Sequence, residues 1–202
     1  GDIIMSVNIA VLVSGGGTNL QALIDAEKSG IINSGKISLV ISNNPDAFAL
    51  ERARKAGIKT AVCDKKQLGA NFEAELISVL EDNNIDIIVL AGFMCILSEK
   101  FTSHFANRII NVHPSLIPSF CGKGFYGLHV HEAALEYGVK VTGATVHFVN
   151  EIPDGGKIIM QKAVEILEND TPETLQKRVM ENAEWIILPL SVEKVCKELK
   201  GE

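Results

Sequence analysis

The sequence has no excess of positive charge and no hydrophobic run long enough to cross a membrane. Its 202 residues carry a formal net charge of -6, whereas proteins that bind nucleic acids generally present a basic face. The longest apolar runs, such as residues 85–91, have the length of a strand, and a transmembrane helix needs roughly 20 apolar residues. We therefore expect no nucleic-acid partner and no membrane partner. No secretory leader is apparent around Met5.

Cysteine is scarce, and its spacing argues against its usual structural roles. The four cysteines are Cys63, Cys95, Cys121 and Cys196. None forms a CxxC pair, so we expect neither a disulfide framework nor a structural zinc site. Reduced thiols predict a cytoplasmic protein. His129 and His131 form a His-x-His pair, but such a pair is unspecific and precedes a helical pattern here, so we expect no metal.

The glycine-rich loop over residues 14–19 lacks the residues that complete the common nucleotide-binding motifs. It has no Walker lysine and no full GxGxxG, so nucleoside triphosphate hydrolysis is not indicated and a dinucleotide site is weakly supported. A nicotinamide dehydrogenase would also need an acidic residue after the second strand, where the chain has Asn43 and Asn44. Glycines and free helix amides suit an anion, and phosphate is the expected ligand. A tight turn without a ligand is the alternative.

Hydrophobic periodicity predicts alternating strands and helices in the first half of the chain. The expected strands are 8–13, 36–42, 59–63, 85–91 and 107–113, and the expected helices are 20–29, 46–56 and 71–83. This order predicts an α/β fold with a Rossmann-like, mostly parallel twisted sheet and flanking helices. Ligands of such sheets bind outside the carboxyl ends of the strands. We therefore expect the glycine loop and residues 91–97 and 111–118 to converge on one crevice.

The pattern changes after Pro118. An irregular loop over 119–127 precedes a helical pattern over 128–137. Two strand-like runs, 141–149 and 157–167, lie close enough in sequence to predict antiparallel strands added in the C-terminal part. Thr171 and Pro172 are typical of a helix N-cap and first turn. We expect this last helix to be interrupted near Pro189.

The most informative polar residues are Asn111 and His113, which end an apolar run and precede Pro114. Side chains at i and i+2 of a strand point to the same face, so an amide and an imidazole should project together. Such a pair can stabilise an oxyanion and move a proton. The alternative is that both residues only cap a strand and satisfy loop backbone groups.

Asp154 lies in a turn-like segment, Pro153-Asp154-Gly155-Gly156. An ordinary turn aspartate is one interpretation. The functional interpretation requires Asp154 to lie near His113, where a carboxylate would favour the imidazolium and orient the ring. Ser14 and Ser115 lack the context of a nucleophile elbow, so a hydrolase triad is not expected.

Asn111, His113 and Asp154 belong to a set of motifs that resembles the glycinamide ribonucleotide formyltransferases. The other motifs are Ser-Gly-Gly-Gly-Thr-Asn-Leu at 14–20, Leu-Ala-Gly-Phe-Met at 90–94, Gly-Ala-Thr-Val-His-Phe-Val at 143–149 and Ile-Ile-Met-Gln at 158–161. They occur in the family's order and span about residues 8–189. Several ordered motifs are more specific than any single one.

The resemblance implies transfer of a formyl group from 10-formyltetrahydrofolate, the co-substrate, to the amine of a phosphoribosylglycinamide in purine synthesis. It implies a single domain over 1–202, with an N-terminal phosphate-binding half of about 8–105 and a C-terminal folate and catalytic half of about 106–202. The partners would be small molecules, and the enzyme a monomer or homodimer without a metal.

The family's functional residues map onto this sequence one by one. The catalytic residues would be Asn111, His113 and Asp154. The phosphoribosylglycinamide site would comprise Gly17, Thr18, Asn19 and Glu184. The folate site would comprise Met94, Cys95, Ile96, Leu97, Asn111, Asn150, Glu151, Ile152, Pro153 and Asp154.

Three features depart from the family's pattern, and other functions compete. Cys95 stands where relatives commonly have arginine, a second folate arginine has no counterpart near Gly69, and the loop over 119–127 is longer. The nearest alternatives are formyltetrahydrofolate hydrolases and formyltransferases that act on methionyl-tRNA. A nucleotide-sensing binding protein without turnover is a further alternative, against which the three catalytic residues argue.

Overall fold

A single seven-stranded sheet forms the centre of the protein, in the order β3-β2-β1-β4-β5-β6-β7. The strands are β1 (Val7–Val13), β2 (Gly35–Ser42), β3 (Lys59–Val62), β4 (Ile87–Leu90), β5 (Ile109–His113), β6 (Val141–Phe148) and β7 (Ile158–Glu165). The structure is a computed structural model that describes residues 6–202, so the sequence before Ser6, including Met5, lies outside it.

The sheet is parallel through its first five strands and antiparallel at one edge. β1 pairs in parallel with β2 and β4, β2 with β3, and β4 with β5. β6 then pairs antiparallel with β5, and β7 with β6. The predicted fold class is therefore confirmed, including the antiparallel strands of the C-terminal part.

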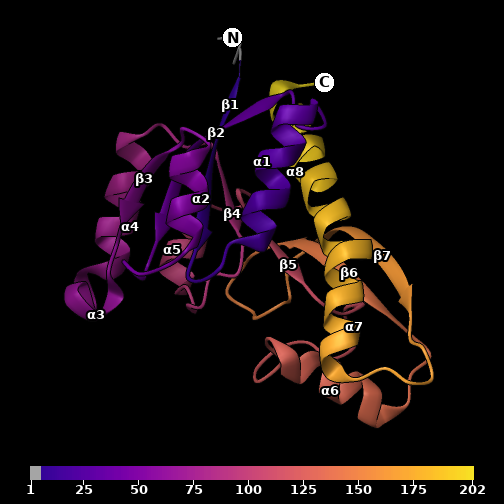
Figure 1. The fold of residues 1–202 in the computed structure, drawn as a ribbon. Helices are drawn as coiled ribbons and strands as arrows, with labels where there is room; N and C mark the ends of the chain where they lie inside the picture. The colour runs from indigo at the N-terminus through magenta and orange to yellow at the C-terminus, as the bar shows by residue number, and fades with distance from the viewer. Residues whose placement is uncertain (1–5) are drawn as a thin grey trace.

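Helices cover both faces of this sheet (Figure 1). They are α1 (Thr18–Ser29), α2 (Ala49–Lys55), α3 (Lys65–Leu68), α4 (Phe72–Asp82), α5 (Glu99–His104), α6 (Leu128–Tyr137), α7 (Pro172–Val179) and α8 (Trp185–Lys200). A 3-10 turn over Gly69–Asn71 and a π-helical turn over Met180–Glu184 complete the list. No helix among residues 6–202 is long and apolar enough to cross a membrane.

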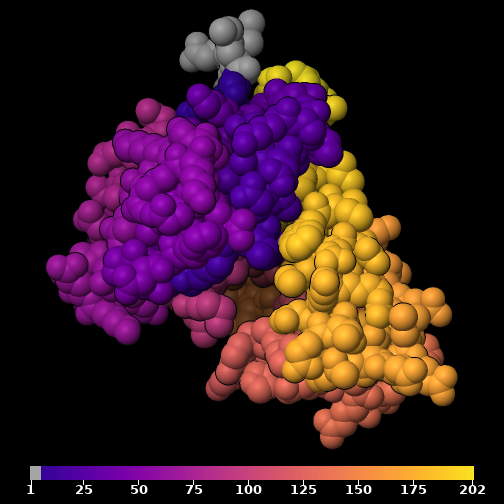
Figure 2. All heavy atoms as spheres, viewed as in Figure 1, coloured from indigo at the N-terminus to yellow at the C-terminus, as the bar shows by residue number. Residues whose placement is uncertain are grey.

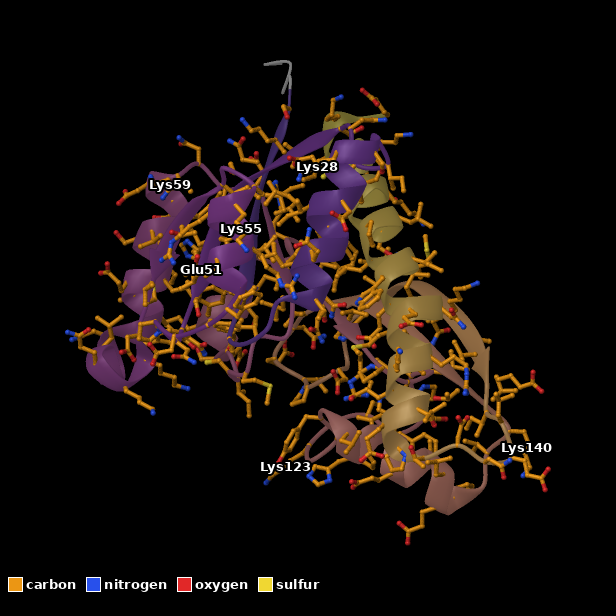
Figure 3. The ribbon with its side chains drawn as sticks, in the orientation of Figure 1. Lys28, Glu51, Lys55, Lys59, Lys123 and Lys140 are labelled. Carbon is orange, nitrogen blue, oxygen red and sulfur yellow. The ribbon has the colours of Figure 1, made fainter. Side chains whose placement is uncertain are left out.

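Alternating side chains of the strands build two hydrophobic cores. On β1, Ile9 and Val11 face one core with α1, α2, α7 and α8, while Ala10 and Leu12 face the other with α4 and α5. This alternation is the two-residue period of a strand buried on both faces. Charged side chains such as Lys28, Glu51 and Lys140 point outward (Figure 3).

Three helical segments differ from the predictions. α2 begins at Ala49 instead of residue 46, because the side chain of Asn44 accepts a hydrogen bond from the backbone N–H of Asp46 and forms a turn there. The short helices α3 and α5 were not predicted. Four and six residues are too few to display a helical period, although the N-cap Ser98 of α5 is a local signal.

The last helix is interrupted before the predicted position. Pro189 lies inside α8, and the irregularity is the π-helical turn Met180–Glu184. A π turn inserts one residue and rotates the residues that follow it around the axis. The expected N-cap is confirmed, since the Thr171 side chain accepts from the backbone N–H of Thr174 at 3.2 Å.

Gly17 is required by its backbone conformation and by close packing. Its φ is 76°, and a Cβ there would lie 2.6 Å from the Cβ of Ala49. A Cβ at Gly16 would meet nothing within 4 Å. We expect Gly17→Ala to lower the free energy of unfolding by about 1–3 kcal/mol and Gly16→Ala to change it far less. Urea denaturation of both variants checks this, and equal midpoints would contradict it.

Candidate active site

Three loops meet at the carboxyl ends of β1, β2 and β4. The Ser14 hydroxyl donates to Oδ1 of Asn43 at 2.6 Å and accepts from the backbone N–H of Met94 at 2.8 Å. The glycine loop after β1 is thereby joined to the segment after β4. β5 ends beside β4 with Asn111 and His113. The convergence expected from a parallel sheet is present.

A cavity of about 640 Å³ opens at this edge of the sheet. Figure 2 shows the surface hollowed between the purple N-terminal part and the salmon and orange C-terminal part. Five of the predicted site residues that line the cavity come from distant parts of the chain: Asn19, Asn111, His113, Asp154 and Glu184. Met94, Cys95 and Ile96 line it as well.

A second cavity of about 160 Å³ adjoins the first and contains the other predicted folate residues. Its lining includes Leu97, Asn150, Glu151, Ile152 and Pro153. Asn111, Asp154, Cys95 and Ile96 line both cavities. Each cavity is lined by residues from both halves of the chain. The polar groups of Asn111 and Asp154 thus stand where the two spaces meet.

Two predicted residues, Gly17 and Thr18, line neither cavity. Gly17 is the N-cap of α1 and Thr18 its first residue, and no side chain caps this helix. Its first backbone amides therefore remain available to an anion. Asn19, one residue further, is the part of this loop that reaches the cavity wall.

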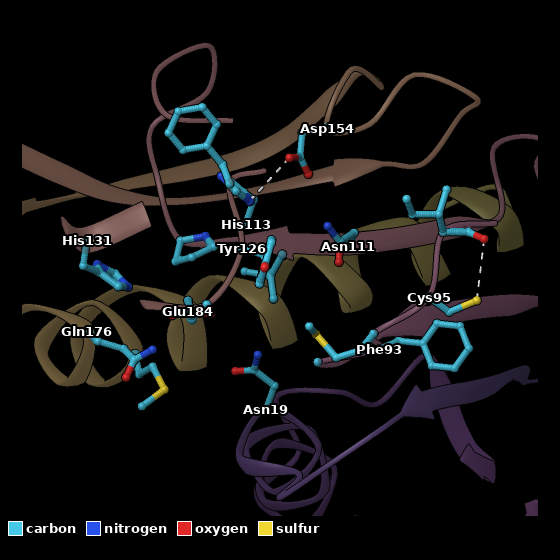
Figure 4. Close-up of a pocket in the computed structure, with 18 of the residues that line it drawn as sticks. Asn19, Phe93, Cys95, Asn111, His113, Tyr126, His131, Asp154, Gln176 and Glu184 are labelled. Atoms are coloured by element: carbon cyan, nitrogen blue, oxygen red, sulfur yellow. Dashed lines mark hydrogen bonds and ion pairs between the residues drawn. The ribbon is translucent and has the colours of Figure 1, made fainter. Parts of the chain in front are cut away.

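His113 and Asp154 lie side by side, pointing toward each other (Figure 4). Nδ1 of His113 is 3.6 Å from Oδ2 of Asp154, and its Nε2 donates to the backbone oxygen of Phe120 at 2.8 Å. The backbone N–H of Gly122 donates to Oδ2 of Asp154 at 2.9 Å. The loop over 119–127 thus supports both residues, a contribution that the sequence did not indicate.

The pKa of Asp154 lies below its usual value. Burial alone would raise it, but the neighbouring imidazoles of His147 and His113 and the backbone N–H of Gly122 outweigh burial. Asp154 is therefore a carboxylate at neutral pH, held between two imidazoles. It also occupies the left-handed backbone region with φ 55°, which aspartate tolerates better than most residues.

Glu184 is buried at the end of the π-helical turn and behaves in the opposite way. Burial raises its pKa from 4.5 to about 7, and the neighbouring side-chain amide of Asn19 opposes the rise. Only 6% of the residue is exposed. Asn19 and Glu184 therefore form one polar wall of the larger cavity, with a carboxyl group that can be neutral or charged near neutral pH.

The formyl transferase family matches residues 7–191 of this chain. A phosphoribosylglycinamide formyltransferase of Haemophilus influenzae is 46% identical over 186 residues, covering 91% of this chain and 84% of that protein. The chain belongs to the phosphoribosylglycinamide formyltransferase family. The predicted resemblance is confirmed.

Other members of this formyltransferase family differ in length but share the fold. The trifunctional purine biosynthetic protein adenosine-3 of Gallus gallus is 46% identical over 94% of this chain, which spans only 18% of that protein. The crystal structure of glycinamide ribonucleotide transformylase 1 from Symbiobacterium toebii superposes with a TM-score of 0.89 at 41% identity. It covers 96% of this chain and 90% of that one.

Lys65 and His131 line the larger cavity but were not among the predicted site residues. Among residues 6–202, Lys65 is the only lysine or arginine in the lining of the larger cavity, and its Nζ donates to Sγ of Cys95 at 3.4 Å. The sequence could have indicated Lys65, since it closely follows the end of β3 and ligands of such sheets bind at the strand ends. His131 is buried with neither ring nitrogen bonded, and burial followed by the charge of His113 lowers its pKa to about 4.

The raised pKa of Glu184 predicts how the free energy of unfolding depends on pH, which can be measured without substrate. Because the pKa of Glu184 is raised in the folded state, the contribution of its carboxyl group to the free energy of unfolding is fully present below pH 4.5. This contribution is lost as the pH rises through about 7. A shift of this size corresponds to about 3 kcal/mol. We expect the stability advantage of the unsubstituted protein over Glu184→Gln to fall by up to that amount from about pH 4 to about pH 8. Urea unfolding measures it, and a difference independent of pH would contradict it.

Proposed function

We propose that this chain transfers the formyl group of 10-formyltetrahydrofolate to the glycinamide amine of 5'-phosphoribosylglycinamide, a step of purine (IMP) biosynthesis. The observation that carries this proposal is the position of Asn111 and Asp154 at the junction of two cavities, with His113 beside Asp154. Two small molecules bound in adjoining spaces would present their reacting atoms to the same three side chains.

The folate would occupy the smaller cavity and the adjoining wall of the larger one. Exposed apolar side chains there, Met94, Ile96 and Ile152, suit a flat aromatic ring. The ribonucleotide would occupy the rest of the larger cavity. Its phosphate would lie at the uncapped amides of Gly17, Thr18 and Asn19, and its ribose near Glu184.

The reaction follows from the three polar groups. The substrate amine attacks the formyl carbon, a new C–N bond forms, and the carbonyl oxygen becomes an oxyanion. The Asn111 amide and an N–H of His113 donate to that oxygen, and one such donor typically contributes ~10²–10³ in rate. The bond from carbon to the folate nitrogen then breaks. The proton released by the amine moves, through a water held by Asp154, to the departing nitrogen.

His113 must change its hydrogen bonding to take part. One ring nitrogen faces Asp154, and the other already donates to the carbonyl of Phe120. It can therefore donate to the oxyanion only by sharing or exchanging the contact with Phe120. The loop over 119–127 therefore affects the reaction, because it carries the carbonyl group that His113 must share or release.

The remaining properties are part of the same proposal. We infer a single formyltransferase domain over 1–202, to which both halves contribute binding residues. Its partners are small molecules, it acts in the cytoplasm, and it is a monomer or homodimer. All four cysteines are free, which suits a reducing compartment. Among residues 6–202, no group of three or more His, Cys, Asp or Glu side chains is arranged to hold a metal ion.

A spectrophotometric assay tests the reaction. The purified protein is mixed with 10-formyltetrahydrofolate, with and without 5'-phosphoribosylglycinamide, and release of tetrahydrofolate is followed. We expect release only when the amine is present. Release without the amine would identify a hydrolase instead. Release only with methionyl-tRNA would identify the tRNA-directed relative.

A further inference from the structure

His147 lies directly opposite Asn111 across the antiparallel pair of β5 and β6. Only 2% of His147 is exposed. Its Nε2 is 3.3 Å from Nδ2 of Asn111 and 3.6 Å from Oδ1 of Asp154. The imidazole therefore contacts one catalytic residue and faces a second. It lines the smaller cavity and does not line the larger one.

The other ring nitrogen determines which tautomer is present. Nδ1 of His147 is 2.9 Å from the backbone oxygen of Phe148. A carbonyl oxygen only accepts, so Nδ1 must carry a hydrogen. In the neutral ring Nε2 then has a lone pair and can only accept. The amide of Asn111 supplies the matching donor, and the Asn111 contact is the shorter of the two at Nε2.

We propose that His147 is a positioning residue that selects the orientation of the Asn111 amide for catalysis. This inference rests on the proposed function. One N–H of the Asn111 amide is bound to His147, and the second N–H remains for the formyl oxygen. If the amide were flipped, its oxygen would face the lone pair of Nε2 and would repel the oxyanion. The neutral Nδ1–H tautomer of His147 thus excludes the flipped orientation of the Asn111 amide, which could not stabilise the oxyanion.

Two conservative variants separate this role from simple packing. In His147→Gln the terminal amide oxygen reaches the former position of Nε2 and can accept from Asn111. In His147→Asn the shorter side chain reaches only the former position of Nδ1, so it can still donate to Phe148 but cannot accept from Asn111. We expect His147→Asn to lower kcat by ~10–100-fold, below the loss for a whole donor, with KM for the ribonucleotide unchanged and KM for the folate changed far less than kcat. His147→Gln should stay within a few-fold of the unsubstituted enzyme.

The reverse order of the two variants, or unchanged turnover in both, would overturn the proposal. A loss confined to KM would also overturn it, because an oxyanion donor acts in the transition state. A double-mutant cycle adds a second criterion. In an Asn111→Ala background, His147→Asn should cause little further loss. Independent, multiplicative losses would show that His147 does not act through Asn111.

The tautomer of His147 can be determined without any substrate. Nitrogen-15 NMR of the folded protein should show His147 protonated at Nδ1 and unprotonated at Nε2. A hydrogen on Nε2 in the neutral ring would overturn the inference even if formyl transfer is observed. Absence of formyl transfer in the unsubstituted protein would instead overturn the proposed function, whatever the tautomer. The two failures are therefore distinguishable.

Discussion

Replacing His113 with alanine is expected to lower kcat for formyl transfer by at least ~10²–10³-fold, the typical loss of one oxyanion donor. The side chain is 6% exposed, yet its polar contacts are an ion pair with Asp154 and a hydrogen bond to the carbonyl of Phe120. The loss in stability should be limited to about 1–3 kcal/mol, from leaving a buried acceptor without its donor.

His129→Ala is the matched control for this experiment. His129 lies on α6. Its side chain is 60% exposed, pairs with Glu132 and packs edge-on against the ring of Tyr126. It does not line the larger cavity. Both variants are compared by kcat, KM and circular dichroism. Turnover of His113→Ala at the level of the control would show that His113 is not catalytic. An unfolded His113→Ala would favour the interpretation that the residue mainly caps the strand.

Replacing Asp154 with asparagine is expected to lower kcat by ~10² or more while the local geometry survives. The amide oxygen can still accept from the N–H of Gly122, which bonds Asp154 at 2.9 Å. The NH₂ group then takes the place of Oδ1 and faces Nε2 of His147, while His113 faces an amide oxygen that carries no full charge. The variant therefore loses the charge that supports the imidazole and orients the water.

The stability of Asp154→Asn should depend on pH in a defined direction. The folded-state pKa of Asp154 is depressed, so its stabilising contribution is present above the ordinary value of 3.8 and is lost as the pH falls through the lower folded value. The unsubstituted protein should therefore exceed the variant in unfolding free energy at neutral pH, and the two should converge in acid. Denaturation series across this range test it. A constant difference would mean that the ionised carboxylate does not stabilise the fold.

The strands could be predicted because their signal is local. Continuous apolar runs such as 85–91 identify strands buried on both faces, and β4 is indeed fully buried. The same local signal placed Asn111 and His113 at a strand end. Short helices could not be found this way. α3 has four residues, less than two turns, and yet it carries Lys65 to the cavity wall.

The role of Asp154 could be suggested from the sequence only through the resemblance to a family. Nothing within 153–156 distinguishes it from an ordinary turn residue. Its depressed pKa arises from His113, His147 and the amide of Gly122, which the fold brings together from three separate segments. Likewise, a glutamate in a helical sequence has no unusual chemistry until burial raises its pKa, as the fold does to Glu184.

By itself, then, the sequence determined the α/β class, the parallel direction of most strands and the edge of the sheet where the polar residues gather. These properties follow from periodicities of two and 3.6 residues, which each segment carries alone. Only the tertiary structure decided that Asn111 meets His147, that residues 119–127 hold the His113 and Asp154 pair, and that Glu184 is buried. Those contacts depend on strand register and on packing between distant segments, which no local pattern encodes.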